Sequence, residues 1–103
     1  MHQIVVEHLY DPPLTEVEMS AEFERLLPLL KTHDFRRLRS WVADDGERGL
    51  DEFEGPDVQT LADLYQRAKV PFVRMWSGTL LEFRAVAEPA VESEGNYEEL
   101  AGP

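Results

Sequence analysis

Residues 50–76 constrain the fold most, because strand, turn, helix and strand signals follow one another there without a gap. A β-rich run over residues 50–54 is stopped by a Gly-Pro pair, and Asp57 can then cap the free amide groups at the start of a helix. Pro71 ends that helix, because it disfavours a helical conformation for the residue before it. A second β-rich run, residues 72–76, follows at once. The apolar residues between the two runs have the spacing of one helix face: Val58, Leu61, Leu64, Tyr65 and Ala68.

The N-terminal third of the chain predicts a strand followed by a helix with a complete start signal. Residues 2–10 are mostly apolar in both alternating sets, which is typical of a strand covered on both faces. Thr15 and Glu18 have the spacing of a capping box, so a helix is expected over residues 15–32. Pro28 interrupts the pattern, and the helix is expected either to kink there or to have a distinct last turn.

Residues 35–43 are the second strand signal, and an acidic hairpin turn leads from them into a third strand over residues 49–54. A second helix is expected over residues 57–69 and a fourth strand near residues 72–83. Strict alternation along the second strand predicts two sets of side chains on opposite faces: Leu38, Ser40 and Val42, and Arg37, Arg39 and Trp41.

This order of elements, β-α-β-β-α-β, predicts an α+β ferredoxin-like sandwich over residues 1–83, with both helices on one face of the sheet. Residues 84–103 are rich in Glu and Ala and predict a flexible acidic tail. An alternative is that Tyr97 and Leu100 bind a neighbouring subunit.

Two helices leave the other face of the sheet uncovered, and an exposed apolar face usually marks an interface. We therefore expect a homodimer of the dimeric α/β-barrel type, with a cavity between two facing sheets. The residues that could form the uncovered face are Trp41, Phe53, Met75 and Trp76.

Charge and cysteine content exclude several kinds of partner. The chain carries 21 acidic and 10 basic side chains, a net charge of −11, so nucleic acid and anionic membranes would be repelled. There is no cysteine, which excludes disulfides and thiolate chemistry. No leader-like or membrane-spanning run is present in the sequence, so a cytoplasmic protein is expected.

Several short motifs resemble one known family, over about residues 3–82 of this chain. They are Val6-Glu7-His8, His33-Asp34, Ser40-Trp41-Val42, Phe53-Glu54-Gly55-Pro56-Asp57 and Ala68-Lys69-Val70-Pro71. The chain thus resembles the nickel-binding-protein-like family of small ferredoxin-like domains of unknown function. The resemblance implies a dimeric α/β sandwich or barrel and, for some members, binding of nickel or another divalent metal. Members often have histidine at the position of Arg39 and cysteine at that of Asp51, which are the nitrogen and sulfur donors that nickel favours.

The first candidate site would hold a small anionic ligand. Guanidinium groups beside indole rings can bind a carboxylate or phosphate by bidentate hydrogen bonds and stacking. An alternative is that these arginines pair with Glu7, Asp51, Glu52 or Glu82. The residues of this predicted ligand set are Glu7, Arg37, Arg39, Trp41, Arg74 and Trp76.

The second candidate site would hold a metal ion through oxygen and imidazole donors: Glu7, His8, His33 and Asp51. Alternatives are that His8 is a hydrogen-bonded core residue and that His33 binds the carbonyl groups at a helix end. The positive charge of Arg39 is expected near this set and opposes a cation, so we predict no tight nickel site and no required cofactor.

Two functions remain open from the sequence. One is a binding module that holds a small ligand or a divalent metal between two subunits. The other is a cofactor-free enzyme, similar to small monooxygenases or isomerases, with Glu7 or His8 transferring a proton. The sequence has none of the phosphate-loop, Ser-His-Asp or zinc-protease motifs that would point to a particular reaction.

Overall fold

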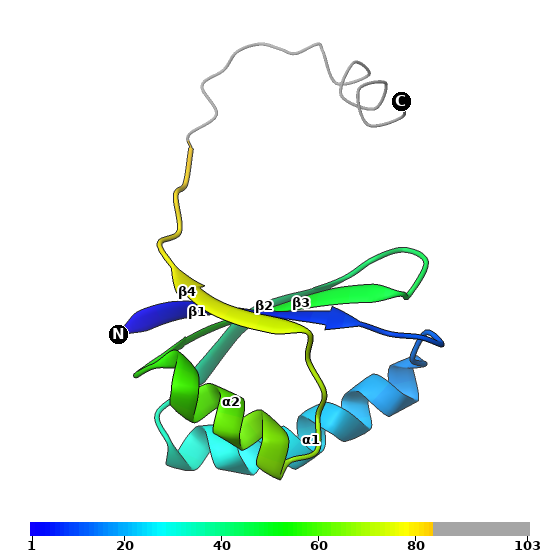
Figure 1. The fold of residues 1–103 in the computed structure, drawn as a ribbon, viewed down its shortest axis with the longest axis horizontal. Helices are drawn as coiled ribbons and strands as arrows, with labels where there is room; N and C mark the ends of the chain where they lie inside the picture. The colour runs from blue at the N-terminus through cyan, green and yellow to red at the C-terminus, as the bar shows by residue number, and fades with distance from the viewer. Residues whose placement is uncertain (84–103) are drawn as a thin grey trace.

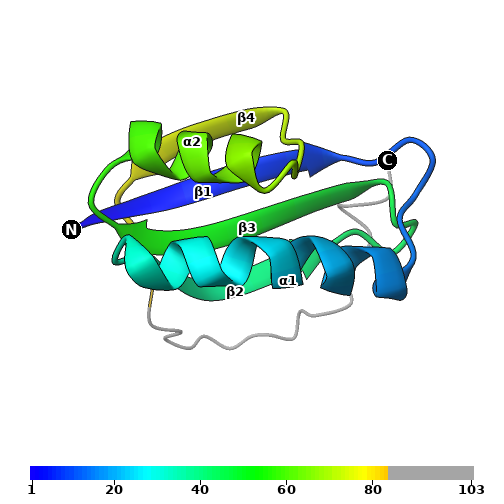
Figure 2. The same cartoon turned by 90° about the horizontal axis from the view of Figure 1, so that it is seen from below.

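The computed structural model describes residues 1–83. The predicted tail, with Tyr97 and Leu100, lies outside these residues. The elements are β1 (His2–Leu9), α1 (Glu16–Thr32), β2 (Arg36–Val42), β3 (Arg48–Gly55), α2 (Val58–Arg67) and β4 (Arg74–Gly78). The strands form an antiparallel sheet in the order β2-β3-β1-β4, and both helices cover one face of it (Figure 1). Figure 2 shows α1 along β2 and β3, and α2 along β1 and β4.

Both helices begin at the predicted caps. The Thr15 hydroxyl accepts a bond from the Glu18 amide at 3.1 Å, and the Glu18 carboxylate accepts one from the Thr15 amide at 2.8 Å. Asp57 accepts a 2.7 Å bond from the amide of Thr60 at the start of α2. The helix α1 continues through Pro28 to Thr32. Pro28 is exposed, so the carbonyl group that lacks its amide partner can bond to water.

The strand β4 is shorter than predicted, because the antiparallel strand β1 beside it does not extend past this point. Gly78 pairs with Gln3, and β1 begins only one residue earlier, at His2. Residues 79–83 therefore have no neighbouring strand within the described part of the chain, and they leave the sheet on the side opposite the helices (Figure 1). We call residues 79–83 the arm.

The core lies between the covered face of the sheet and the two helices. It is built from Ile4, Val6, Leu26, Leu30, Phe35, Phe53, Leu61, Leu64, Tyr65, Ala68 and Val70. Phe53 belongs to this core and Met75 packs against it, so neither lies on the uncovered face, where Trp41 and Trp76 do lie. Within residues 1–83 of one chain, only one face of β1 is covered: Ile4 and Val6 are buried, whereas Val5 and Glu7 are only half-buried on the uncovered face.

Within residues 1–83, no helix has both the length and the apolar character needed to cross a membrane.

Candidate functional site

The sheet divides the predicted site residues between its two faces. Successive side chains of a strand point to opposite sides, so His8 lies on the covered face and Glu7 on the other, which we call the open face. The predicted ligand set and the predicted metal set are therefore both split. The covered face holds His8, Arg37 and Asp51, and the open face holds Glu7, Arg39, Trp41, Arg74 and Trp76.

Arg37 lies on the face opposite to the one that its spacing predicts. The pairing of β2 with β3 skips one residue between Arg37 and Arg39, which is a β-bulge with Leu38 as the extra residue. Alternation restarts after the bulge, so Arg37 shares the covered face with Ser40. Leu38 instead faces the same side as Trp41. The prediction that Arg37, Arg39 and Trp41 share one face is wrong, because it assumed regular alternation and the bulge interrupts that alternation.

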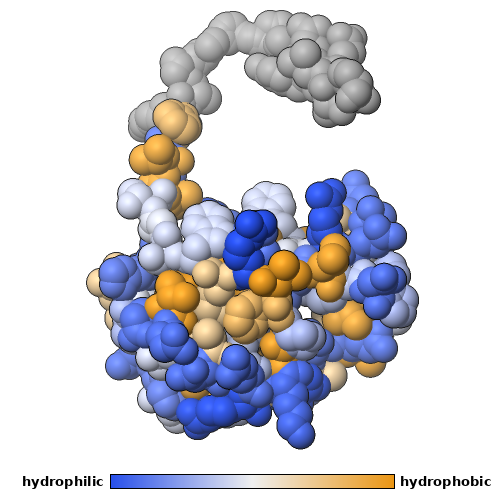
Figure 3. Space-filling model, in the orientation of Figure 1, coloured by the Kyte–Doolittle hydropathy of each residue, from blue (hydrophilic) through white to orange (hydrophobic). Residues whose placement is uncertain are grey.

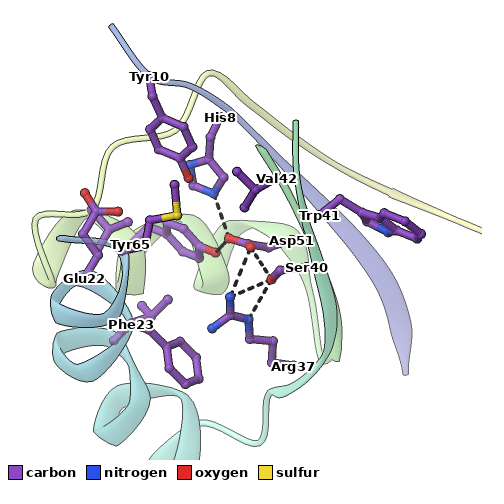
Figure 4. A pocket seen from close by; sticks show the side chains of 13 residues that line it. His8, Tyr10, Glu22, Phe23, Arg37, Ser40, Trp41, Val42, Asp51 and Tyr65 are labelled. Atoms are coloured by element: carbon purple, nitrogen blue, oxygen red, sulfur yellow. Dashed lines mark hydrogen bonds and ion pairs between the residues drawn. The ribbon is translucent and has the colours of Figure 1, made fainter. Parts of the chain in front are cut away.

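A hydrogen-bond network centres on Asp51 of β3 (Figure 4). Its Oδ2 lies 2.7 Å from Nε2 of His8 and accepts a 2.8 Å bond from the hydroxyl of Tyr65. Its Oδ1 accepts a 2.6 Å bond from the hydroxyl of Ser40 and lies 3.5 Å from Nη2 of Arg37. Arg37 also donates to the oxygen of Ser40 from Nε and Nη2, at 2.9 and 2.6 Å. Side chains from β1, β2 and α2 thus converge on one carboxylate.

Both ring nitrogens of His8 have partners that can only accept a hydrogen bond. The Nδ1 atom lies 3.0 Å from the carbonyl oxygen of Pro71, and the Nε2 atom faces the carboxylate of Asp51. The protonated imidazolium is the form that satisfies both bonds. His8 is only 5% exposed, so in this form it makes a buried ion pair with Asp51. The alternative that His8 is a hydrogen-bonded core residue is confirmed.

The surroundings of the network fix the protonation of its other groups. Burial acts to raise the pKa of Asp51, but hydrogen bonds from His8 and Ser40 outweigh it, and the pKa is lowered overall. Burial and the charge of Asp51 raise the pKa of Tyr65, and they raise the pKa of Tyr10 to about 12. Burial also raises the pKa of Glu22 at the edge of the network. Asp51 is therefore an ionised acceptor, and the tyrosine hydroxyls beside it keep their protons.

The cavity beside this network has a volume of about 60 Å³. An apolar cavity that holds benzene is about 150 Å³, so there is room here for water but not for a typical metabolite. Its principal polar groups already bond to one another, which leaves neither ring nitrogen of His8 free to take up a proton from a substrate. We conclude that this network mainly stabilises the fold.

The lowered pKa of Asp51 predicts a specific acid sensitivity. A carboxyl group whose pKa is lower in the folded state contributes stability above its unfolded pKa, about 3.9, and loses it as the pH falls through the folded value. We expect the free energy of unfolding to decrease below about pH 5. Urea unfolding from pH 7 to pH 3 measures this, with Asp51→Asn as reference because it lacks the titrating group. Equal pH dependence of the two proteins would contradict the prediction. The raised pKa of Glu22 affects the pH dependence of stability in the opposite direction, and it does so in both proteins.

The open face carries two matching clusters of Arg, Glu and Trp. In the first, Glu7 accepts bonds from Arg74 at 3.2 Å and from the indole of Trp76 at 2.7 Å. The bond from Trp76 is the main cause of the lowered pKa of Glu7; burial opposes it, and the charge of Arg74 and its hydrogen bond add to the lowering. In the second cluster, the carboxylate of Glu52 bonds to Nε of Arg39 at 2.9 Å and to the indole nitrogen of Trp41 at 3.1 Å.

These clusters confirm the alternative that the arginines pair with acidic residues. A third pair, Arg36 with Glu54, lies at one end of the same face. Each carboxylate that the described strands place on the open face therefore has an arginine partner. The sequence signal for the clusters is an Arg-x-Trp spacing that occurs twice, at Arg39 and at Arg74, once on each edge strand.

Beside Trp76 the open face has a hollow of about 390 Å³. Its floor and walls are mainly apolar: Val5, Leu38, Leu50, Trp76, Leu80 and Leu81. Leu80 and Leu81 belong to the arm, which Figure 3 shows as a largely hydrophobic segment standing away from the body of the protein. Exposure in the arm reaches 70% for Leu81 and 86% for Phe83, so the described part of the chain leaves these side chains uncovered.

The predicted metal set is not brought together. Glu7 is bonded on the open face, and Nδ1 of His33 lies 2.9 Å from the carbonyl oxygen of Leu29 at the end of α1, as the alternative reading expected. Only His8 and Asp51 meet, and no group of three potential metal ligands occurs within residues 1–83. The sequence predicts the positive charge of Arg39 near this pair. Arg39 lies on the other face, and Arg37 is the cation beside the pair instead.

We therefore still predict that nickel binds weakly. Nickel at His8 would have to break the bonds to Asp51 and Pro71 and approach the charge of Arg37. Calorimetry with nickel is expected to show no submicromolar site, and any weak binding should disappear in His2→Ala. One submicromolar site per chain, lost in His8→Ala but kept in His2→Ala, would contradict this.

Tyr65 and Ser40 belong to the network, and Tyr10 stacks on His8 with ring centroids 5.4 Å apart, but none of the three was among the predicted site residues. Tyr65 occupies an apolar helix position, and its buried ring gives no hint that its hydroxyl reaches β3. The only usable signal was the presence of polar atoms on otherwise apolar faces. Pairing of β2 with β3 was needed to bring Ser40 to Asp51, and packing of α2 on the sheet was needed to bring Tyr65 there.

The fold and this division of the sheet define a small α+β domain, compatible with a ferredoxin-like fold. A crystal structure of SCO4226 from Streptomyces coelicolor A3(2) is similar to it, with a TM-score of 0.69 and 14% identity, over 78% of this chain and 99% of that one. At this identity the likeness describes the fold alone. No protein-family model matches the chain, and no curated protein matches it.

Proposed function

We propose that this protein is a homodimeric binding domain, in which the open faces of two copies meet and enclose a small ligand. The observation that carries the proposal is the character of this face. In a chain with a net charge of −11, it combines two exposed tryptophans, an apolar hollow and carboxylates that are each paired with arginine.

Pairing of the charges favours a second copy of the chain as the partner. Two surfaces of the same net charge repel each other, and burial of an unpaired charge costs several kcal/mol, of the order of 3–5. On the open face Glu7 and Glu52 already have partners within the same copy. Two such faces can therefore approach without placing unpaired carboxylates against each other.

The arm adds apolar area on the same side of the sheet. It leaves β4 away from the helices, with Leu81 and Phe83 uncovered by the described part of the chain. A second copy placed over the open face would lie next to these side chains. The hollows of the two copies would then face the space between the sheets, which gives the small-ligand cavity of a dimeric α/β-barrel arrangement.

Sedimentation of the full chain at micromolar concentration tests the dimer, and native mass spectrometry of the same sample tests for a retained ligand. We expect a species of twice the 11.9 kDa chain mass. A single species at the chain mass would overturn the proposal.

Neither Glu7 nor His8, the two residues on which the enzyme alternative depends, is suited to transfer a proton in this cavity. The carboxylate of Glu7 is bonded to Trp76 and Arg74, and its pKa is lowered, so it is a weak base. His8 lies on the covered face and cannot reach a ligand on the open one.

A further inference from the structure

Within residues 1–83, the hollow on the open face offers a ligand no free charge. Of the described residues that line it, Glu52 alone is ionisable. Arg39 bonds to one of its oxygens at 2.9 Å and the indole of Trp41 bonds to the other at 3.1 Å. The remaining walls are mainly aliphatic and aromatic side chains.

We propose that the hollow binds an uncharged, mainly apolar small molecule. This inference rests on the proposed function and names the class of its ligand. A charged group that entered the hollow would lose its hydration and find no free counter-ion, which is unfavourable. An apolar molecule has no such hydration to lose. It also removes the exposed faces of Trp76 and Leu38 from water, which is favourable. The sequence-based expectation of a carboxylate or phosphate ligand is replaced, because the acidic partners neutralise the arginines.

Size and rigidity support the same class of ligand. A volume of about 390 Å³ lies within the usual range of small-molecule sites, roughly 300–1,000 Å³. The indole nitrogen of Trp76 donates to Glu7 at 2.7 Å, which holds the ring in one orientation at the wall of the hollow. A ring fixed in this way provides a flat surface on which a ligand can stack with little further loss of entropy.

Two fluorescent probes that differ only in charge test the inference. N-phenyl-1-naphthylamine is uncharged, and 1-anilinonaphthalene-8-sulfonate is the same molecule with a sulfonate group. In titrations of the full-length protein, we expect the uncharged probe to bind about tenfold more tightly than the sulfonate or better, because the sulfonate has no counter-ion. The affinity for the uncharged probe should decrease in Trp76→Ala and much less in Trp41→Ala, since Trp76 lines the hollow and Trp41 does not.

A matched pair of variants tests the role of charge pairing. Glu52→Gln frees the guanidinium of Arg39 beside the hollow, so the preference for the uncharged probe should fall by about tenfold. Glu54→Gln frees Arg36 on the same face but away from the hollow, and the preference should stay unchanged. Both variants remove one negative charge, so their comparison cancels the change in net charge.

The results separate this inference from the proposed function. If sedimentation shows a dimer but the uncharged probe does not bind, the inference is overturned while the dimer stands. Equal affinity for the two probes, or the same response in Glu52→Gln and Glu54→Gln, also overturns it. If the uncharged probe binds as expected to a protein that is monomeric, the inference is supported and the proposed dimer is overturned.

Discussion

Replacing Asp51 by alanine is expected to lower the free energy of unfolding by about 3–5 kcal/mol, because removal of one partner leaves a buried charge uncompensated. His8 is 5% exposed and would keep its bond to Pro71 but lose its counter-ion. The hydroxyl groups of Ser40 and Tyr65 would lose their acceptor as well. For a domain of this size the loss corresponds to a fall in Tm of roughly 12 °C or more. Urea unfolding monitored by circular dichroism measures it.

The matched control is Asp63→Ala on the exposed surface of α2, which removes the same charge from the chain. It should change the stability by less than about 0.5 kcal/mol. A double-mutant cycle gives the stricter test: in a His8→Ala background, Asp51→Ala should cost much less, because the unpaired cation is gone. Equal costs in both backgrounds would show that the ion pair does not carry the effect.

Replacing Trp76 by aspartate is expected to weaken the proposed homodimer by about 100-fold or more, since an unpaired charge and lost apolar area each oppose association. Trp76 is 44% exposed beside Glu7, so the new carboxylate would also repel this residue and its copy in the partner. Leu81→Asp should weaken the dimer in the same direction, and Leu81 is exposed enough that the fold does not depend on it. Sedimentation over a range of protein concentrations measures the association constant of each variant.

The control for these variants is Val17→Asp, which adds the same charge at a 79% exposed valine on α1, away from the open face. It should leave the association constant unchanged. If Trp76→Asp and Leu81→Asp associate as the unaltered chain does, the open face is not the interface. Circular dichroism of each variant separates loss of association from loss of fold.

The order and the starts of the elements could be predicted from the sequence, because local signals determine them. The capping box of Thr15 and Glu18 and the cap at Asp57 act within four residues of the chain. The second helix ends at Arg67, before the position that Pro71 restricts, and Lys69 after it has a left-handed conformation. The capping interactions depend only on residues close in the chain, so they indicate where each helix starts, and the order β-α-β-β-α-β could be predicted from such local signals.

The end of β4 and the faces of β2 could not be predicted in the same way. The strand β4 ends at Gly78 because β1 begins at His2, which is a property of the pairing and not of residues 79–83. The bulge at Leu38 places Arg37 on the covered face, and no glycine or proline in residues 36–42 signals it.

The sequence by itself determined the order and the starts of the elements, and it limited the chemistry to carboxylates, imidazoles, guanidinium groups and indoles. Only the tertiary structure decided which of them meet. Asp51 joins His8, 43 residues away, in a buried pair, while Glu7, the neighbour of His8 in the chain, pairs with Trp76 on the other face. The reason is physical: neighbouring side chains of a strand point to opposite sides, and the register between strands selects the partners on each side.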